Sequence, residues 1–424
     1  MSLERTIPAT DLTGLEVQLR RGNVTIEEGD PSVVVLVADL GNGVSEADLR
    51  VDVENGVLRI IQAPSPHAGG SWGGLNIFDD LGIGSITAQF GRIDLRLALP
   101  ASLARAAVTT GLGQIAVSQW HGELDVRTGK GDVNLGKGAG RVSAASGMGG
   151  VTIAGFSERC QVQTGMGDVA VVGGHGRAEV RTGLGRVRIA DAELDLEAHT
   201  GKGDLVLDHV SGRAKLATGL GMITVAGAED LAVEAKSGKG NIELKGAFRA
   251  IEAESGFGAI TGRIENLRGT ADLATGHGEI DFGFAGDLVV RFDIATRRGQ
   301  VTSDVPLVQV GKPGPEGFFS QRFVGTFGAG DVDATVRLRS GHGAIHLQQL
   351  PPRSAGADVP SMPTEASPRP AQPETPVEAP PEPAKPEAVS PLPVSPDEQR
   401  LKVLEALSRG DISVEEAERR LSAV

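Results

Sequence analysis

Residues 110–163 read TGLGQIAVSQWHGELDVR, TGKGDVNLGKGAGRVSAA and SGMGGVTIAGFSERCQVQ, which are three consecutive units of equal length. Each unit begins with a Thr/Ser-Gly-x-Gly motif. Copies of the motif begin at Thr110, Thr128, Ser146, Thr164, Thr182, Thr200, Thr218, Ser237, Ser255, Thr275 and Ser340, and a degenerate copy, TRRG, begins at Thr296. The interval is constant at about 18 residues over the first seven copies and varies after them, with the longest before Ser340. So constant a period predicts a tandem-repeat protein.

Apolar residues occupy the same positions in every unit. Leu124 and Val126 fall on one side of a predicted strand, and Asp125 and Arg127 fall on the other. Units of equal length with fixed apolar columns can stack, so that each strand bonds to its copy about 4.8 Å away. The sequence therefore predicts an all-β fold, a right-handed β-solenoid of coils of about 18 residues. We expect two main strands per coil, with the motif at one repeated corner.

The motif residues have predicted roles at that corner. The second glycine is expected to adopt a positive φ, which glycine reaches without a Cβ clash. These structural turn glycines are Gly113, Gly131, Gly149, Gly167, Gly185, Gly203, Gly221, Gly240, Gly258 and Gly278. Thr128 and its equivalents share the parity of the inward residues, so their hydroxyls are expected to point inward or into the corner and to satisfy turn amides.

The flanks of the repeats are less regular. Residues 1–100 are predicted to form an irregular β cap with the first coils, including a hairpin that turns at Asn55-Gly56. Residues 101–350 are the predicted solenoid repeats. An insertion between the last two repeats holds four phenylalanines between Phe318 and Phe327. It is predicted to be a hydrophobic plug over the last coil, with a partner-binding loop as the alternative.

The C-terminal part changes character. Residues 351–394 are predicted to be a disordered, proline-rich linker, because 15 of the 23 prolines lie between Pro351 and Pro396. Residues 395–424 predict a helical hairpin, with capping signals at Ser395 and Ser413 and a break at Gly410. Its predicted interaction residues are Leu401, Leu404, Leu407, Ile412, Val414, Ala417 and Leu421. So short a hairpin is not expected to be stable alone, so we predict that it contacts a protein partner or a second copy.

Composition excludes several classes of function. The net charge of −14 argues against a nucleic-acid partner and disfavours docking on an anionic membrane. The sequence lacks an apolar stretch long enough for an integral membrane segment, and the N-terminus has no signal-peptide pattern, so a cytoplasmic location is expected. Cys160 is the single cysteine, which excludes an intrachain disulfide. It falls in an apolar column and is predicted to be a small core residue rather than a nucleophile.

The runs TGxGDVxL and SGxGxIxL over roughly residues 5–350 resemble the DUF4097 family of β-strand-repeat proteins, which are candidate adhesins. The tail LKVLEALSRGDISVEEAERRL is similar to the SHOCT-like helical module found with such repeats in YvlB- and LiaX-type proteins. The resemblance implies a scaffold or envelope-stress protein and supplies no catalytic residues. The module is C-terminal here, whereas LiaX-like proteins carry it at the N-terminus, and the transmembrane segments of many relatives are missing.

Other chemistries fit the pattern poorly. A calcium roll needs an acidic residue in nearly every turn, but only Asp132, Asp168 and Asp204 follow a motif as aspartate. The threonine column is expected to face inward, which disfavours an ice-binding face. His342 and His346 have no acidic company that would suggest a metal site. We therefore expect no cofactor.

The expected function is a non-catalytic scaffold or interaction protein that presents a long solenoid surface. A binding or sensing component of an envelope-stress response, with a membrane-associated partner, is the first alternative. A carbohydrate-active β-helix enzyme is the second, and it would need clustered carboxylates on one outer face. The outward residues instead mix both signs, as in Asp125 beside Arg127, so we expect no enzymatic activity.

Overall fold

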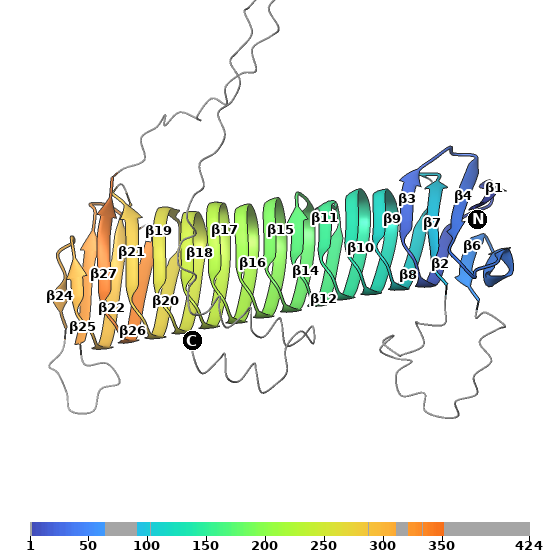
Figure 1. The fold of residues 1–424 in the computed structure, drawn as a ribbon. Coiled ribbons are helices and arrows are strands. Elements are labelled where there is room, and N and C mark those ends of the chain that lie inside the picture. Colours follow the sequence, from blue (N-terminus) through green and yellow to red (C-terminus); the bar gives the residue numbers. More distant parts are fainter. Residues whose placement is uncertain are drawn as a thin grey trace, which may run out of the picture. The chain divides into compact units, whose positions relative to one another are not determined.

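The computed structural model describes residues 2–63 and 91–351, except residues 102, 287, 311–320 and 333. These residues belong to one compact unit, Met1–Gly356, which is an elongated solenoid (Figure 1). All 27 of its described strands belong to one sheet. Within the described ranges the only helical segment is the 3-10 turn η1 (Glu46–Asp48). The predicted helical hairpin, including Leu401, Leu404, Leu407, Ile412, Val414, Ala417 and Leu421, lies outside the described residues, as does the proline-rich linker after Pro351.

The strands fall into three groups along the chain. The N-terminal strands are β1 (Ser2–Pro8), β2 (Gly14–Arg21), β3 (Val24–Glu28), β4 (Val33–Leu40), β5 (Leu49–Glu54), β6 (Val57–Gln62), β7 (Ile93–Leu99) and β8 (Arg105–Leu112). The central strands are β9 (Ile115–Lys130), β10 (Val133–Met148), β11 (Val151–Gly155), β12 (Arg159–Met166), β13 (Val169–Val172), β14 (His175–Leu184), β15 (Val187–Lys202), β16 (Leu205–Leu220), β17 (Ile223–Lys239) and β18 (Ile242–Phe257). The C-terminal strands are β19 (Ile260–Leu267), β20 (Thr270–His277), β21 (Ile280–Ala285), β22 (Val290–Arg298), β23 (Val301–Ser303), β24 (Val308–Gln309), β25 (Gln321–Phe327), β26 (Ala334–His342) and β27 (Ile345–Leu350).

Coil-to-coil stacking is parallel and follows the period of the sequence. In the β9–β10 pair, Ile115 lies opposite Val133 and Val126 opposite Ala144, and each of these partners is one repeat further along the chain. The inward columns form the core, where Val126 and Val133 are fully buried. Each fully buried aliphatic side chain contributes about 1.5–3 kcal/mol relative to an exposed one. The solenoid predicted from the period and the columns is thus confirmed.

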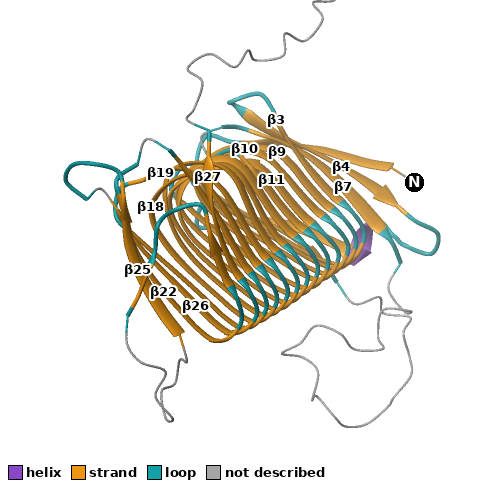
Figure 2. Cartoon of the chain, turned by 90° about the vertical axis from the view of Figure 1, so that its left-hand side faces the viewer, coloured by secondary structure: helices purple, strands orange, loops and turns teal. Residues whose placement is uncertain are grey.

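The expectation of two strands per coil is wrong for most of the central coils. β9, β10, β15, β16 and β18 each run for 16 residues, and β17 runs for 17. The ladder continues around the second bend, where Gly140 lies opposite Gly122. Because the coils have equal length, each backbone group at the bend lies opposite the equivalent group of the next coil and can pair with it. In these coils only the motif corner interrupts the strand, and Figure 2 shows the short corner loops in a row along one long edge.

The order of the coils in space differs from their order in the sequence at both ends. At the N-terminal end β2 lies between β6 and β8, and β3 lies between β7 and β9. At the C-terminal end β26 lies between β20 and β22, and β27 lies between β21 and β23. The first and last coils of the sequence therefore lie inside the stack, and the coil next to each of them in the sequence covers it from outside.

Antiparallel strands cover both ends. β4 pairs with β1 and β7, and β5 pairs with β6 through the predicted hairpin, in which Asn55 and Gly56 have φ of 52° and 75°. At the other end β25 pairs with β22 and β24. Phe327 of β25 packs edge-on against Phe284 with ring centroids 5.2 Å apart. These contacts give the described part of the insertion a capping position, whereas Phe318 lies outside the described residues.

Candidate interaction surfaces

The predicted turn glycines line the motif corner, and their main constraint is the coil beneath them. Nine of the ten have φ between +148° and +159°. Gly278 does not share this range, so positive φ is not the general reason for glycine. A Cβ on Gly131 would lie 2.0 Å from the carbonyl oxygen of Gly113, and one on Gly278 would lie 2.1 Å from that of Gly258. The absence of a side chain therefore lets successive corners stack in contact.

The hydroxyl column points inward, as predicted, but its partners are carbonyl oxygens and not turn amides. Thr128 is 5% exposed, and its hydroxyl donates to the carbonyl oxygen of Gly113 at 3.0 Å. The hydroxyl of Ser146 donates to Gly131 in the same way, also at 3.0 Å. Each motif thus satisfies the backbone of the preceding corner. This arrangement gives the threonines a structural role and leaves them buried beneath the surface.

The residue after the second glycine also serves the corner. The carboxylate of Asp132 accepts from the amide of Gly150 at 2.8 Å, and that of Asp168 accepts from the amide of Arg186 at 2.8 Å. The side-chain oxygen of Asn241 does the same for Ala259 at 3.0 Å. Aspartate and asparagine are interchangeable in this role, which makes the scattered aspartates backbone acceptors.

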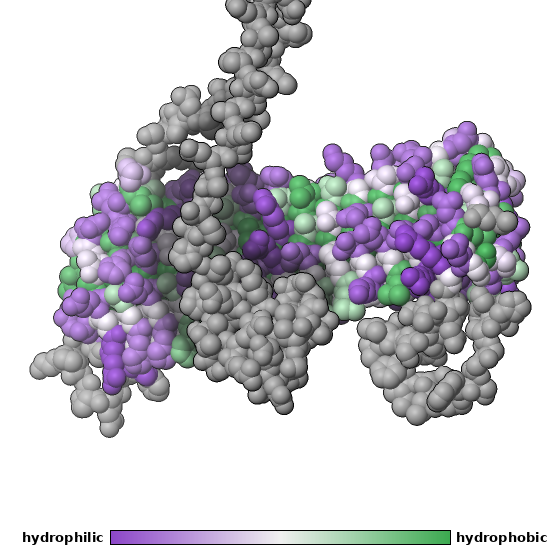
Figure 3. Space-filling model, in the orientation of Figure 1, coloured by the Kyte–Doolittle hydropathy of each residue, from purple (hydrophilic) through white to green (hydrophobic). Residues whose placement is uncertain are grey.

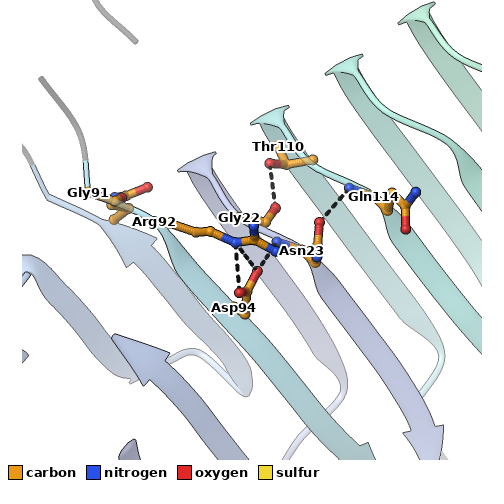
Figure 4. A network of polar contacts seen from close by, with 8 residues as sticks. Gly22, Asn23, Gly91, Arg92, Asp94, Thr110 and Gln114 are labelled. Atoms are coloured by element: carbon orange, nitrogen blue, oxygen red, sulfur yellow. Dashed lines mark hydrogen bonds and ion pairs between the residues drawn. The ribbon is translucent and has the colours of Figure 1, made fainter. Parts of the chain in front are cut away.

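The same pattern, in which a side-chain oxygen accepts from a backbone amide of the neighbouring coil, begins in the N-terminal end coil (Figure 4). There the carboxylate of Asp94 accepts a hydrogen bond from the backbone amide of Asn23 at 2.8 Å. The side-chain oxygen of Asn23 in turn accepts one from the backbone amide of Gln114 at 2.9 Å. Arg92 donates to both oxygens of Asp94. The hydroxyl of Thr110 donates to the carbonyl oxygen of Gly22 at 3.1 Å. The irregular end coil therefore presents the same polar edge as the regular repeats.

A groove crosses the outer face of five neighbouring strands, β16, β17, β18, β20 and β26, and has a volume of about 750 Å³. Half-buried alanines such as Ala232 and Ala250 form its floor. We call it the charged groove, and its charged lining is Arg213, Lys215, Glu234, Glu252, Glu254, Asp272, Arg337 and Arg339. Small outward side chains leave room between rows of long charged ones. In Figure 3, hydrophilic and hydrophobic residues are interspersed over the visible face of the solenoid.

Ion pairs link the two signs of charge in and beside this groove. The ammonium group of Lys236 lies 2.9 Å from Glu234 and 3.4 Å from Glu252, and Lys215 lies 3.6 Å from Glu234. The hydrogen bond from Lys236 lowers the pKa of Glu234, and the same bond raises the pKa of Lys236. Both groups are therefore held in their charged forms.

This electrostatic state bears on the enzyme alternative. A general acid in a glycosidase needs a carboxyl group whose pKa is raised. Hydrogen bonds from neighbouring donors instead leave the pKa lowered at Asp30, Glu197, Glu234 and Asp293, which is the opposite direction. No group of three or more potential metal ligands occurs among the residues that the structure describes.

Cys160 lies in the core, where it is fully buried, as predicted. Burial raises the pKa of its thiol to about 12. A buried and protonated thiol is a poor nucleophile. His342 does not pair with His346 but stacks on His277, with ring centroids 4.7 Å apart.

The third residue of the motif forms a column that is exposed except at the half-buried Leu112, Met148 and His342, and that no sequence pattern singled out. In β-ladder order the column is Arg21, Leu112, Lys130, Met148, Met166, Leu184, Lys202, Leu220, Lys239, Phe257, His277, His342 and Arg298. We call it the corner ridge, because it follows the row of corner loops in Figure 2. The sequence contains these residues, but they occupy a variable position of the repeat. Their alignment into one column follows from the pairing of the coils.

The stacked coils and their motif corners agree with a known family of repeat proteins. The family model described as Toastrack DUF4097 matches residues 2–283, two thirds of the chain. The chain belongs to the DUF4097 (Toastrack) family. Because the match ends within the solenoid, the resemblance of the tail to a SHOCT-like module stays a prediction. No match was found among curated proteins.

Two solved structures resemble this DUF4097 protein. One is a candidate cell adhesion protein from Clostridium sporogenes ATCC 15579, 11% identical, with a TM-score of 0.15, covering 82% of this chain and 99% of that chain. The other is a candidate adhesin from Parabacteroides distasonis ATCC 8503, 11% identical, with a TM-score of 0.25, covering 82% of this chain and 97% of that chain. At these scores neither structure bears on what this chain binds. Within the described ranges, no helix is long and apolar enough to cross a membrane.

Proposed function

We propose that this protein is a non-catalytic interaction protein that presents its solenoid surface, and above all the charged groove, to a protein partner. The observation that carries the proposal is a set of ionised side chains of both signs on neighbouring strands. Strands in one ladder are about 4.8 Å apart, so these charges keep a fixed spacing. A polypeptide with complementary charges can match such a pattern.

The ion pairs within the groove are weak enough for its charged side chains to pair with a bound protein instead. Glu234 and Lys236 are partly exposed, with side-chain exposures of 31% and 44%. Exposed ion pairs contribute about 0–1 kcal/mol each, so opening them costs little. A partner that supplies its own charges and covers the alanine floor gains both the new pairs and the buried apolar area.

Affinity capture with the full-length protein tests the groove. The variant Glu234→Gln/Glu252→Gln/Asp272→Asn removes three groove carboxylates, and Glu27→Gln/Glu28→Gln/Glu243→Gln removes three exposed carboxylates outside it. We expect a partner that is retained by the wild type and the control and lost from the groove variant. Identical capture by all three proteins would show that the groove is not the recognition surface.

We further propose that residues 395–424 supply a helical module for self-association or docking, as their sequence predicts. Light scattering on the full-length protein, on a chain ending at Leu350 and on Leu404→Asp tests this. The expected result is an oligomer for the full-length protein and monomers for the other two. The same subunit number in all three would remove self-association as the role of the tail.

A further inference from the structure

The corner ridge is chemically unlike the rest of this acidic protein. It consists of five apolar aliphatic side chains, three aromatic or imidazole rings and five cations, with no carboxylate among them. Large apolar side chains on it are unusually open to solvent: Met166 is 47% exposed, Leu184 44%, Leu220 41% and Phe257 54%. Large apolar residues in a row on a surface indicate an interaction site rather than chance exposure.

The basic residues of the ridge differ from those on the adjacent strand face in their ion pairs. Arg21, Lys130, Lys202, Lys239 and Arg298 make no ion pair within the part of the chain that the structure describes. On the adjacent strand face, by contrast, Arg127 pairs with Asp125, Arg181 with Glu179 and Lys236 with Glu234. The ammonium group of Lys239 instead lies 5.9 Å from the centroid of the Phe257 ring.

Acidic residues do border the ridge on its other side, at Asp132, Asp168, Asp204 and the exposed Glu279. The three aspartates are turned to the backbone, where each accepts from an amide of the next coil at 2.8–3.0 Å. Aspartate is short, whereas the long lysine side chains carry their charges further from the corner. Charges further than about 8 Å are screened at physiological salt, so a partner at the ridge senses these lysines more than the net charge of −14.

We propose that the corner ridge docks on the surface of an anionic phospholipid bilayer. A row of residues one per coil, about 4.8 Å apart, follows one long edge of the solenoid (Figure 2), and a straight row of this kind can meet a flat surface. A bilayer offers negative headgroups and an apolar interior at the same boundary, which is what interspersed lysines and exposed Leu, Met and Phe require. A second copy of the ridge would place lysines opposite lysines, which repel each other. A soluble polyanion would pair with the lysines but would leave the apolar side chains exposed to water.

This inference rests on the proposed role of the solenoid as an interaction surface, but it concerns a different face from the charged groove. Co-sedimentation with phosphatidylcholine vesicles, with and without phosphatidylserine, tests it on the full-length protein. We expect binding only to the vesicles that contain phosphatidylserine, weakened by added salt. Loss of vesicle binding with an intact groove partner would separate the two proposals.

Matched variants identify the face. Lys130→Ser/Lys202→Ser/Lys239→Ser should weaken binding at least about tenfold, given the contribution of each basic residue near an anionic membrane. Arg127→Ser/Arg181→Ser/Lys236→Ser removes the same charge from the adjacent face and should bind like the wild type. Met166→Ser/Leu184→Ser/Leu220→Ser should also weaken binding, and more of its residual binding should be lost on adding salt. Circular dichroism and thermal melts establish that every variant is folded.

Three results would overturn the proposal. The first is no binding of the wild type to vesicles with phosphatidylserine. The second is an equal loss in the ridge variant and its matched control, which would make the attraction a general property of basic residues. The third is equally tight binding to soluble polyphosphate that the Met166→Ser/Leu184→Ser/Leu220→Ser variant retains, which would assign the ridge to polyanions.

Discussion

At the scale of single residues, the motif corner depends both on glycines that have no Cβ and on side chains that bond to the backbone. Gly167 leaves space for the carbonyl oxygen of Gly149, which would lie 2.1 Å from a Cβ. The hydroxyl of Thr164 donates to that same oxygen at 3.1 Å. Asp168 then accepts from the next coil. The first two roles explain why the hydroxyl residue and the second glycine of the motif recur with so little variation, whereas the position of Asp168 varies.

Gly167→Val should destabilise the protein far more than Asp168→Ala. A side chain at Gly167 meets backbone in a stacked corner and also has a φ of +152°, so we expect a loss of more than about 3 kcal/mol. Asp168→Ala removes one exposed hydrogen bond, and Asp168→Asn should keep it, as Asn241 does. Urea melts measure the three losses. An equal loss for the glycine and alanine variants, or a rise in Tm on adding calcium, would contradict these roles at the corner.

The buried thiol predicts a dependence of stability on pH. The pKa of Cys160 is about 12 in the folded protein and near its ordinary value of 9.0 when unfolded. The folded state therefore binds more protons between these values, so its free energy of unfolding should fall as the pH rises from about 9 to 12. Cys160→Ala should lack this part of the slope. Denaturant melts across this range measure the difference, and parallel slopes would refute it.

At the scale of elements, the solenoid depends on antiparallel strands that cover its ends. β25 covers β22 along seven paired positions, and Arg322 of β25 donates to both oxygens of Asp293. That pair lowers the pKa of Asp293 and leaves it charged. The cap is therefore held by backbone pairing, one ion pair and the Phe327 contact with Phe284.

Phe327→Ala should loosen the C-terminal cap without affecting the middle of the rod. In a repeat protein each coil contacts only its neighbours, so a local defect stays local. Hydrogen exchange should accelerate in β22, β24 and β25 and stay unchanged in β15 and β16. Phe257→Ala, which removes an exposed ring, is the control and should accelerate neither region. Uniform acceleration by Phe327→Ala would show that the solenoid opens as a single cooperative unit.

At the scale of the whole molecule, the interleaved ends tie distant parts of the chain together. β26 brings Arg339 to 3.8 Å from Asp272, although strands β21 to β25 lie between these residues in the sequence. Removing the last coil in sequence would therefore leave a gap inside the rod instead of shortening it. Both ends share this arrangement, which protects the terminal coils from simple fraying.

A chain that ends at Pro351 should keep the Tm of the solenoid, because every described strand is present. A chain that ends at Val332 lacks β26 and β27 and should melt at a clearly lower temperature, because β20 and β22 each lose β26 from one side. Differential scanning calorimetry of both chains gives the comparison. Equal melting temperatures would mean that β22 can close the gap against β20 at no cost.

The sequence by itself determined the repeat length, the inward columns and the motif corner, because a constant period with alternating Leu124 and Val126 leaves stacking as the way to bury them. It also placed Cys160 in the core. The tertiary structure alone decided the order of the end coils, since pairing across a long loop depends on which edges are free. It likewise decided the stacking of glycines, the acceptors of the threonine hydroxyls and the corner ridge. Those features arise between residues in different coils, and their contacts exist only once neighbouring coils are in register.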